Sequence, residues 1–380
     1  MMEWWSVGGG QRHIRHSAFV IHHFMANNKA PSPPMNPILT TLPASDPAMI
    51  LRFRDRQFAA ELIATALMHL DLFSWLAEHD GADDVAICRE FELHARPVDV
   101  LMTLCRASGL VTTDSNGAHH LTASGREHLV KGSPWYLGPY YAPIRETPAV
   151  QGFLRVLRTG KPANWQAKTD AKDWHTSMLD PEFARSFTEL MNCRGLVFGQ
   201  HLARALTPHL VGKTRLLDVG GGSGIYTSTM VAAHAHLRGT VLEQSPVDAL
   251  VKQEIAKHGL SERVDVFSGD MFAVDWPAAD VVLLSNVLHD WDEPEARQLV
   301  AKAAAALPSG GLLVVHDAFI ADDKHGPMPA AEYSALLMHI TQGKCYSAAE
   351  YGAMMRDCGL VPGAYHATVS DRGFMTAVKA

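Results

Sequence analysis

Hydrophobic residues in the first third of the chain recur with the period of a helix. Between Ala59 and Phe73 they follow the i, i+3, i+4, i+7 spacing that gathers them on one helical face. Shorter helices and strands are expected to follow, at residues 85–91, 97–108, 110–112 and 120–122. The turn between these two strands contains Asn116-Gly117, a strong hairpin signal. Two helices followed by a hairpin predict a winged helix, which we assign to residues 37–134.

The second half of the chain alternates short apolar strands with helices. The expected parallel strands lie at residues 214–219, 239–242, 263–267, 280–284 and 312–315. This alternation predicts an open, Rossmann-like sheet with helices on both faces. A terminal hairpin formed by residues 364–369 and 374–378 should add an antiparallel edge. The predicted fold class is therefore α/β, with a mainly α-helical winged-helix domain before a sheet domain at residues 206–380.

Two further segments differ from these domains. Residues 1–36 show no periodic pattern, so we expect a disordered tail, or a misassigned start with Met35 as the true first residue. The histidines of this tail lack the spacing of a metal site, and no metal is expected. Residues 135–205 begin with a stretch rich in aromatic side chains. We expect a helical linker here that packs between the domains and contributes to a pocket for a flat, apolar substrate.

Composition and charge restrict the possible partners. The 380 residues are 47% hydrophobic and carry a formal net charge of -7, which is typical of a globular protein with a sizeable core. Between Arg52 and Lys131 there are 8 Lys+Arg against 12 Asp+Glu, so the winged helix is acidic. Binding to nucleic acid needs concentrated positive charge, and we therefore expect this module to form a homodimer instead.

The chain also lacks the patterns of membrane and secreted proteins. No stretch approaches the roughly 20 apolar residues that span a bilayer, so no membrane association is expected. The five cysteines are dispersed and form no Cys-x-x-Cys pair. This is typical of reduced thiols and predicts a cytoplasmic protein.

The most informative run is the glycine-rich stretch Leu216–Gly224. A buried strand enters it, and a helix is expected to follow. The dinucleotide fingerprint Gly-x-Gly-x-x-Gly fits in neither register, because the pattern from Gly220 and Gly222 is Gly-x-Gly-x-Gly. Asp218 precedes the loop, and a carboxylate there suits a ligand with an ammonium group and no pyrophosphate. The predicted cofactor is S-adenosylmethionine.

Three later positions agree with this cofactor. Glu243 ends the second strand, where an acid can accept both ribose hydroxyls. Asp270 follows the third strand and is expected to bind the adenine amino group. Met271 and Phe272 are expected to pack on the two faces of the ring, although each alone is also typical of an ordinary core.

The catalytic candidate is His289, which follows the fourth strand at the edge that faces the ligand in such sheets. A lone histidine is usually structural, and this chain has 21, so its position is what favours a catalytic role. Asp317 ends the fifth strand and can accept a hydrogen bond from the far ring nitrogen, which would fix the tautomer. Asp292 is expected to cap the next helix.

At these residues the sequence resembles the S-adenosylmethionine-dependent O-methyltransferases of the caffeate, hydroxyindole and bacterial polyketide-tailoring type. The resemblance covers about residues 48–380. It is carried by Leu216–Gly224, Gly269–Phe272, His289-Asp290-Trp291 with Glu293, Leu307–Gly311 and Phe187–Met191. It implies a homodimer that methylates a hydroxyl of a small aromatic or polyketide-like substrate.

The resemblance also implies roles for single residues. His289 stands where the family has its general base, which works without metal, and Asp317 where an acid steers that base. Met191 stands where a methionine packs on the substrate ring, and Ser285 where a residue helps to hold the cofactor. Beside them, Asn286 and Asp290 are further expected substrate contacts.

The sequence departs from the family pattern at two positions. Cys345 replaces a second acid that flanks the base, and Gly195 replaces a serine near the cofactor carboxylate. These departures leave alternatives open. The protein could be a non-methylating S-adenosylmethionine-dependent decarboxylase, hydroxylase or pericyclase, or an N- or C-methyltransferase. A winged-helix regulator is less favoured because the module is acidic. The identity of the substrate stays open.

Overall fold

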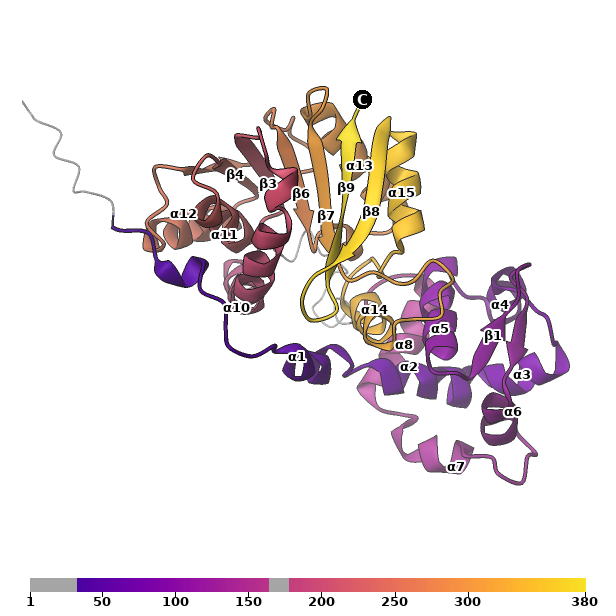
Figure 1. Cartoon of the computed structure of the whole chain (residues 1–380). Helices are drawn as coiled ribbons and strands as arrows, with labels where there is room; N and C mark the ends of the chain where they lie inside the picture. The colour runs from indigo at the N-terminus through magenta and orange to yellow at the C-terminus, as the bar shows by residue number, and fades with distance from the viewer. Residues whose placement is uncertain (1–32, 164–177) are drawn as a thin grey trace, which may run out of the picture. The chain divides into compact units, whose positions relative to one another are not determined.

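The computed structural model describes residues 33–163 and 178–380 (Figure 1). Most of the predicted tail, residues 1–36, and the aromatic residues Trp165 and Trp174 lie outside this part of the chain. The described part from residue 33 onward belongs to one compact unit.

The N-terminal half is mainly helical. Its helices are η1 (Pro37–Leu39), α1 (Ala48–Asp55), α2 (Ala59–Thr65), the π-helical turn η2 (Ala66–Leu70), α3 (Leu72–Glu78), α4 (Asp84–Phe91), α5 (Ala95–Ala107), α6 (Ala123–Leu129), α7 (Gly138–Tyr141), η3 (Ala142–Ile144) and α8 (Pro148–Thr159). Strands β1 (Val111–Thr113) and β2 (His119–Leu121) pair antiparallel between α5 and α6. The helix, helix and hairpin of the winged-helix prediction are thus present within a residue or two of the expected bounds.

The helix expected over Ala59–Phe73 is interrupted. Asp71 adopts a left-handed backbone conformation with φ 52°, so a second helix, α3, begins at Leu72. Leu70 before the break and Phe73 after it are both buried in the same core. The hydrophobic spacing hid the break because both helices bury their apolar side chains. The Asp71 carboxylate also pairs with the Lys131 ammonium at 2.8 Å, an interaction that sequence spacing does not reveal.

The C-terminal half contains a seven-stranded sheet in the order β5-β4-β3-β6-β7-β9-β8. Its strands are β3 (Arg215–Val219), β4 (Arg238–Glu243), β5 (Val264–Ser268), β6 (Val281–Ser285), β7 (Leu312–Asp317), β8 (Leu360–Ala367) and β9 (Gly373–Lys379). The first five pair in parallel, whereas β9 is antiparallel to β7 and β8. The predicted α/β sheet with a terminal antiparallel hairpin is therefore confirmed.

Helices cover the sheet and connect it to the N-terminal half. They are α10 (Pro181–Ala205), η4 (Thr207–His209), α11 (Ile225–Ala233), α12 (Val247–Lys257), η5 (Leu288–Asp290), α13 (Glu293–Ala306), α14 (Met328–Ile340) and α15 (Ala348–Asp357). The Asp292 side chain caps α13 as predicted, accepting from the Glu293 N–H. Helix α14 lies between β7 and α15 in the chain but packs against α1, α2, α5 and α8 of the N-terminal half.

No single helix in the described residues is long and apolar enough to cross a membrane. One bent pair, Ala48–Leu70 with Leu72–Glu78 at an angle of 61°, has the length and composition to do so. Apolar side chains on both members, such as Leu62 and Leu76, are buried in the protein core.

Helices α10 and α11 approach closely because two glycines face the contact. A Cβ at Gly195 would lie 2.6 Å from Ile225 Cγ2, and one at Gly199 would lie 2.5 Å from Thr229 Oγ1. Both neighbours are buried on α11. The contact therefore depends on the absence of side chains at these two positions.

We expect Gly199→Ala to lower the free energy of unfolding by about 1–3 kcal/mol, because the added methyl group overpacks the helix contact. Urea denaturation followed by circular dichroism measures this change. Cys193→Ala, at an exposed position on the same helix, is the control and should stay within about 0.5 kcal/mol of the wild type. Equal stability of both variants would contradict the close packing described here.

Candidate functional site

A cleft opens at the edge of the sheet where the parallel strands end. Its walls come from the loops that follow β3, β4, β5 and β6 and from helices α10 and α14. It holds about 1270 Å³ of space not filled by atoms, part of it open to solvent.

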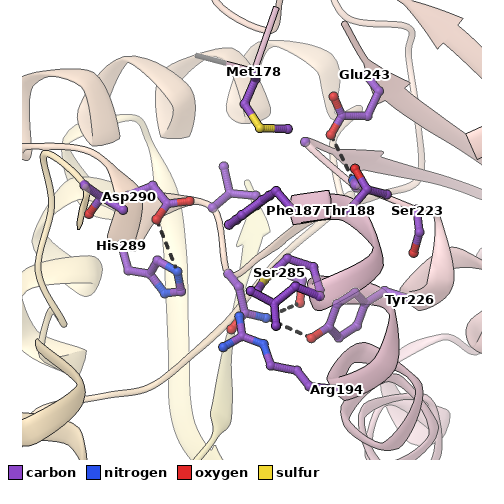
Figure 2. Close-up of a pocket in the computed structure, with 18 of the residues that line it drawn as sticks. Met178, Phe187, Thr188, Arg194, Ser223, Tyr226, Glu243, Ser285, His289 and Asp290 are labelled. Carbon is purple, nitrogen blue, oxygen red and sulfur yellow. Dashed lines mark hydrogen bonds and ion pairs between the residues drawn. The ribbon is translucent and has the colours of Figure 1, made fainter. Parts of the chain in front are cut away.

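The glycine loop forms one wall of this cleft. Gly220 and Gly222 have φ values of 63° and 59°, a region that residues with a Cβ rarely adopt. Both line the cleft, so their backbone is exposed to a ligand. The Gly222 N–H donates to Glu243 Oε1 at 2.9 Å, which ties the loop to the end of β4 (Figure 2).

Glu243 lies at the rim of the cleft beside this loop. Its second carboxylate oxygen accepts from the Gln244 N–H at 3.0 Å. Burial raises the pKa of Glu243 to about 7, although the two backbone hydrogen bonds act in the opposite direction. A ligand with two adjacent hydroxyls would donate to this carboxylate and favour its charged form.

Asp218 is placed differently from the expectation. Its carboxylate is 1% exposed on β3, beneath Gly221, and is not part of the cleft lining. Asp218 Oδ2 accepts from the Thr227 hydroxyl at 2.8 Å. Burial raises the pKa of Asp218 to about 7. The side chain thus supports the loop from below and joins it to α11, and it does not reach a ligand in the cleft.

The expected adenine contacts are only partly assembled. Met271 lines the cleft, whereas Asp270 and Phe272 are not part of the lining. Asp270 Oδ1 accepts from the Phe272 N–H at 2.8 Å, which shapes the turn after β5. The Phe272 ring packs edge-on against Trp291, with ring centroids 4.7 Å apart. Trp291 itself lines the cleft. It belongs to the motif His289-Asp290-Trp291, but no ligand contact was expected from it.

His289 and Asp317 meet at the ends of the neighbouring strands β6 and β7. His289 Nδ1 forms a hydrogen bond with Asp317 Oδ1, and both side chains are buried. Burial alone would raise the pKa of Asp317, but the charge of His289 and the hydrogen bonds that Asp317 accepts outweigh it, so the pKa is lowered. An ionised Asp317 holds the ring proton of His289 on Nδ1 and leaves Nε2 as an acceptor.

Two further groups hold Asp317 in place. The Ala318 N–H donates to Oδ1 at 2.7 Å, and the Tyr351 hydroxyl donates to Oδ2 at 2.9 Å. Tyr351 comes from α15 and is fully buried. The sequence did not reveal Tyr351, which lies 34 residues beyond Asp317 and carries no recognisable motif.

Cys345, at the position where the resemblance implies a second acid, is buried and does not line the cleft. Its backbone N–H donates to Ser334 Oγ at 3.0 Å. Burial raises the pKa of its thiol well above the usual range, so it stays neutral. A carboxylate beside the histidine is that of Asp290, whose Oδ1 lies 3.6 Å from His289 Nε2 (Figure 2). Burial raises the pKa of Asp290 to about 6, and the charge of His289 opposes this shift.

Ser285 and Asn286 continue the floor of the cleft. Ser285 shares a hydrogen bond with His316 Nδ1 at 2.8 Å, and burial lowers the pKa of His316 to about 3, so this ring is neutral. Asn286 Nδ2 donates to the Tyr226 hydroxyl at 2.9 Å. Asn286 has a left-handed backbone with φ 54°, the kind of local strain that persists where function requires it.

Two polar atoms of the lining lack partners. Asn286 Oδ1 and Thr188 Oγ1 are buried and have no hydrogen-bond partner among the residues that the structure describes. Buried polar atoms without partners are rare, because each costs free energy. Both atoms can accept hydrogen bonds, so they fit a ligand that carries ammonium or hydroxyl groups.

Helices α10 and α14 form the opposite wall. Met191 lines the cleft as expected, together with Phe187 from the aromatic segment. Among the described residues of that segment, Trp135 and Tyr140 are exposed and Phe153 is buried in the core, and these three do not line the cleft. The remaining lining from these helices and the C-cap of α14 comprises the apolar residues Leu190, Leu336, Leu337 and Ile340 and the polar residues Thr188, Arg194, Tyr333 and Thr341. Arg194 and Tyr333 had not been predicted.

The described residues contain no group of three or more His, Cys, Asp or Glu side chains placed to hold a metal ion. A glycine loop, an acid at the end of the next strand and a buried His–Asp pair at one sheet edge are typical of an enzyme that binds a nucleotide-like cofactor. Similarity to known proteins identifies the enzyme family.

Residues 154–361 match the model of the O-methyltransferase domain family. The chain is 35% identical over 299 residues to the 3-hydroxy-5-methyl-1-naphthoate 3-O-methyltransferase of Streptomyces sahachiroi, covering 78% of this chain and 84% of that protein. The chain belongs to this O-methyltransferase family. The predicted family and enzyme class, an S-adenosylmethionine-dependent O-methyltransferase, are confirmed.

Two solved structures extend the match. One is an O-methyltransferase family 2 protein from Planctomyces limnophilus in complex with apigenin, with a TM-score of 0.80, 29% identity and coverage of 90% of this chain and 98% of that one. The other is an O-methyltransferase from neocarzinostatin biosynthesis in complex with S-adenosylmethionine and 2-hydroxy-5-methyl naphthoic acid. Its TM-score is 0.51 at 26% identity, with coverage of 86% and 96%.

The buried carboxylate of Asp218 predicts a pH dependence of stability that can be tested. The pKa of Asp218 is about 7 in the folded protein, whereas that of an unfolded Asp is about 3.9. Between these pH values the folded state therefore binds more protons than the unfolded state. Stability is therefore lost as the pH rises through this range. Asp218→Asn removes the titration, so the melting temperature of the variant minus that of the wild type should become more positive from pH 5 to pH 8.

Differential scanning fluorimetry of the ligand-free protein measures this difference. Asp265→Asn changes an exposed carboxylate on β5 and serves as the control. A difference for Asp218→Asn that does not change with pH, or that becomes more negative, would show that Asp218 is not held as a buried neutral acid.

Proposed function

We propose that this enzyme transfers the methyl group of S-adenosylmethionine to a hydroxyl of a small aromatic metabolite, with His289 as the general base. The observation that carries the proposal is the His289–Asp317 pair. Asp317 fixes the histidine proton on Nδ1, and His289 lines the same cleft as the glycine loop and the apolar side chains of α10 and α14.

The donor side of the cleft fits the cofactor. The Glu243 carboxylate is placed to accept the two ribose hydroxyls, and Met271 with Trp291 can enclose the adenine ring. Gly220 and Gly222 let the backbone approach the ligand. Asn286 Oδ1, which lacks a partner among the described residues, suits a donor such as the ammonium group. Ser285 lies beside it and belongs to the same wall.

The acceptor side favours a flat ring. Phe187 and Met191 from α10 face a largely apolar wall from α14, and aromatic rings and thioethers pack well on planar ligands. Relatives that act on a hydroxynaphthoate or bind apigenin support an aromatic acceptor. Asp290 lies next to the histidine, where it can also contact the acceptor.

The chemistry assigned to the chain is proton removal and positioning. When bound, S-adenosylmethionine supplies an electrophilic methyl group on its sulfonium. His289 Nε2 would accept the proton of the acceptor hydroxyl as its oxygen takes the methyl group, and the C–S electron pair would leave with S-adenosylhomocysteine. The resulting imidazolium is stabilised by Asp317 on one ring nitrogen and by Asp290 near the other. Because the cleft holds both reactants in one geometry, positioning contributes much of the rate.

We expect His289→Ala to lower kcat by roughly 10²- to 10⁴-fold, the usual contribution of a general base. Binding of S-adenosylhomocysteine, measured by calorimetry, should stay near the wild-type value. Turnover near wild type with intact cofactor binding would reject His289 as the base.

The same assay separates the alternative activities. An isotope-labelled methyl group followed by mass spectrometry identifies the product atom as O, N or C. Release of S-adenosylhomocysteine with candidate phenols distinguishes methyl transfer from a decarboxylase, hydroxylase or pericyclase, which leave the cofactor intact. An electrophoretic shift with DNA at moderate salt would support the alternative that the protein is a winged-helix regulator.

We further propose that the winged-helix region, residues 37–134, forms a homodimer interface. Helix α1 has no buried residue, and Ile50 and Phe53 on it are 76% and 63% exposed. A second group of exposed apolar side chains, Trp135 and Tyr140, follows this region. Large exposed apolar side chains that cluster on one part of a protein usually mark an interface.

The five cysteines are free, which agrees with a reducing, cytoplasmic environment.

If so, Ile50→Glu should weaken the dimer, because it introduces a charge that dimerisation would bury. Analytical ultracentrifugation at several concentrations should then show a monomer where the wild type is a dimer. Val361→Glu, at an exposed apolar position on β8, is the matched control and should leave the dimer intact. A monomeric wild type, or a dimer unaffected by Ile50→Glu, would contradict the proposal.

A further inference from the structure

Arg194 has an unusual position for a cationic side chain. It projects from α10 into the lining of the cleft (Figure 2). Its Nη1 donates to the Tyr333 hydroxyl at 3.0 Å, and its Cζ lies 5.8 Å and 5.9 Å from the rings of Phe198 and Tyr333. An arginine has five N–H donors, and no carboxylate among the described residues lies within ion-pair distance of this one.

Other arginines of the interior are better satisfied. Arg96 donates to the Gly343 and Gly160 carbonyls, and its charge lies 3.8 Å from Asp292. Arg372 pairs with Asp55 at 3.4 Å. Removing a cation from water without an anionic partner costs free energy. The Arg194 guanidinium thus has N–H donors that form no ion pair with an acid in the described part of the chain.

The surroundings of Arg194 add positive charge. The Arg372 guanidinium lies against the same two rings, 4.2 Å from Tyr333 and 5.3 Å from Phe198. Arg54 also belongs to the cleft lining. Two carboxylates accompany these three guanidinium groups: Asp55, which pairs with Arg372 and lies 4.0 Å from Arg54, and Asp290 beside His289. The acceptor side therefore carries an excess of positive charge that favours an anion.

Tyr333 relates this charge to the base. Its ring packs edge-on against the His289 ring at a centroid distance of 5.7 Å, and its hydroxyl accepts from Arg194. The base and the guanidinium thus flank the same side chain. A flat acceptor with its hydroxyl at His289 Nε2 can present a second group to Arg194. A carboxylate is the group that a planar guanidinium binds best, through two parallel hydrogen bonds.

We propose that Arg194 is a carboxylate-binding residue of the acceptor pocket, so that the preferred acceptor is an aromatic hydroxy acid. This inference rests on the proposed function and narrows its substrate class. The carboxylate of the cofactor's methionine moiety has the same chemistry, and the experiment has to distinguish the two sources.

The test measures binding to the complex with S-adenosylhomocysteine, so that it does not depend on turnover. The probes are 3-hydroxy-1-naphthoate and its uncharged amide, titrated by fluorescence into wild type, Arg194→Gln and Arg194→Lys. The wild type should bind the acid more tightly than the amide by roughly 10- to 100-fold, the range of charge-assisted hydrogen bonds. Arg194→Gln should remove this preference, and Arg194→Lys should restore part of it.

Arg185→Gln, at an exposed position on the same helix, is the control and should keep the wild-type preference. The donor is tested separately with S-adenosylhomocysteine and with methylthioadenosine, which lacks the carboxylate. Arg194→Gln should leave both affinities unchanged. This result also shows that the variant is folded.

Three outcomes overturn the inference. The first is equal binding of acid and amide by the wild type. The second is an unchanged preference in Arg194→Gln. The third is a loss of affinity for S-adenosylhomocysteine but not for methylthioadenosine, which would assign Arg194 to the cofactor. Preferential binding of the acid without methylation of any acceptor would instead uphold Arg194 and reject the proposed reaction.

Discussion

Parallel pairing of β3, β6 and β7 is the constraint on which the rest of the site depends. Parallel strands end at the same edge of a sheet, so residues far apart in the chain become neighbours there. The glycine loop after β3, His289 after β6 and Asp317 at the end of β7 meet in this way. A shift in the register of β7 by one residue would turn Asp317 to the other face of the sheet and replace it with a neighbour. The orientation of the base is therefore a property of the sheet.

Charge is distributed unevenly along the cleft. Burial raises the pKa values of Glu243 and Asp290, whereas Asp317 stays ionised because His289 and Tyr351 are hydrogen-bonded to it. The carboxylate that holds the base is thus charged at rest, and a cation or hydrogen-bond donor that binds beside Glu243 or Asp290 would favour their charged forms. Together with Arg194, they make the cleft responsive to the charges of what it binds.

Much of this arrangement could be predicted from local sequence. The strand positions, the glycine loop and the His289–Asp317 pair follow from hydrophobic runs and from the rule that strand ends face the ligand. Other features depend on contacts that no local pattern encodes. The break at Asp71 is hidden because both flanking helices bury apolar side chains. Tyr351 reaches Asp317 only through the packing of α15, and Asp218 turns toward Thr227 because α11 lies over the loop. Gly195, where the family pattern has a serine, faces Ile225 so closely that a side chain does not fit.

The two walls of the cleft are formed by different parts of the protein. The donor side is formed largely by backbone and by residues at strand ends, whereas the acceptor side is formed by side chains of α10 and α14. Helix α14 also packs against α2, α5 and α8. Substitutions in the N-terminal helices can therefore reshape the acceptor wall without touching the sheet. An enzyme of this construction can acquire new acceptors in the course of evolution while its donor chemistry is inherited unchanged.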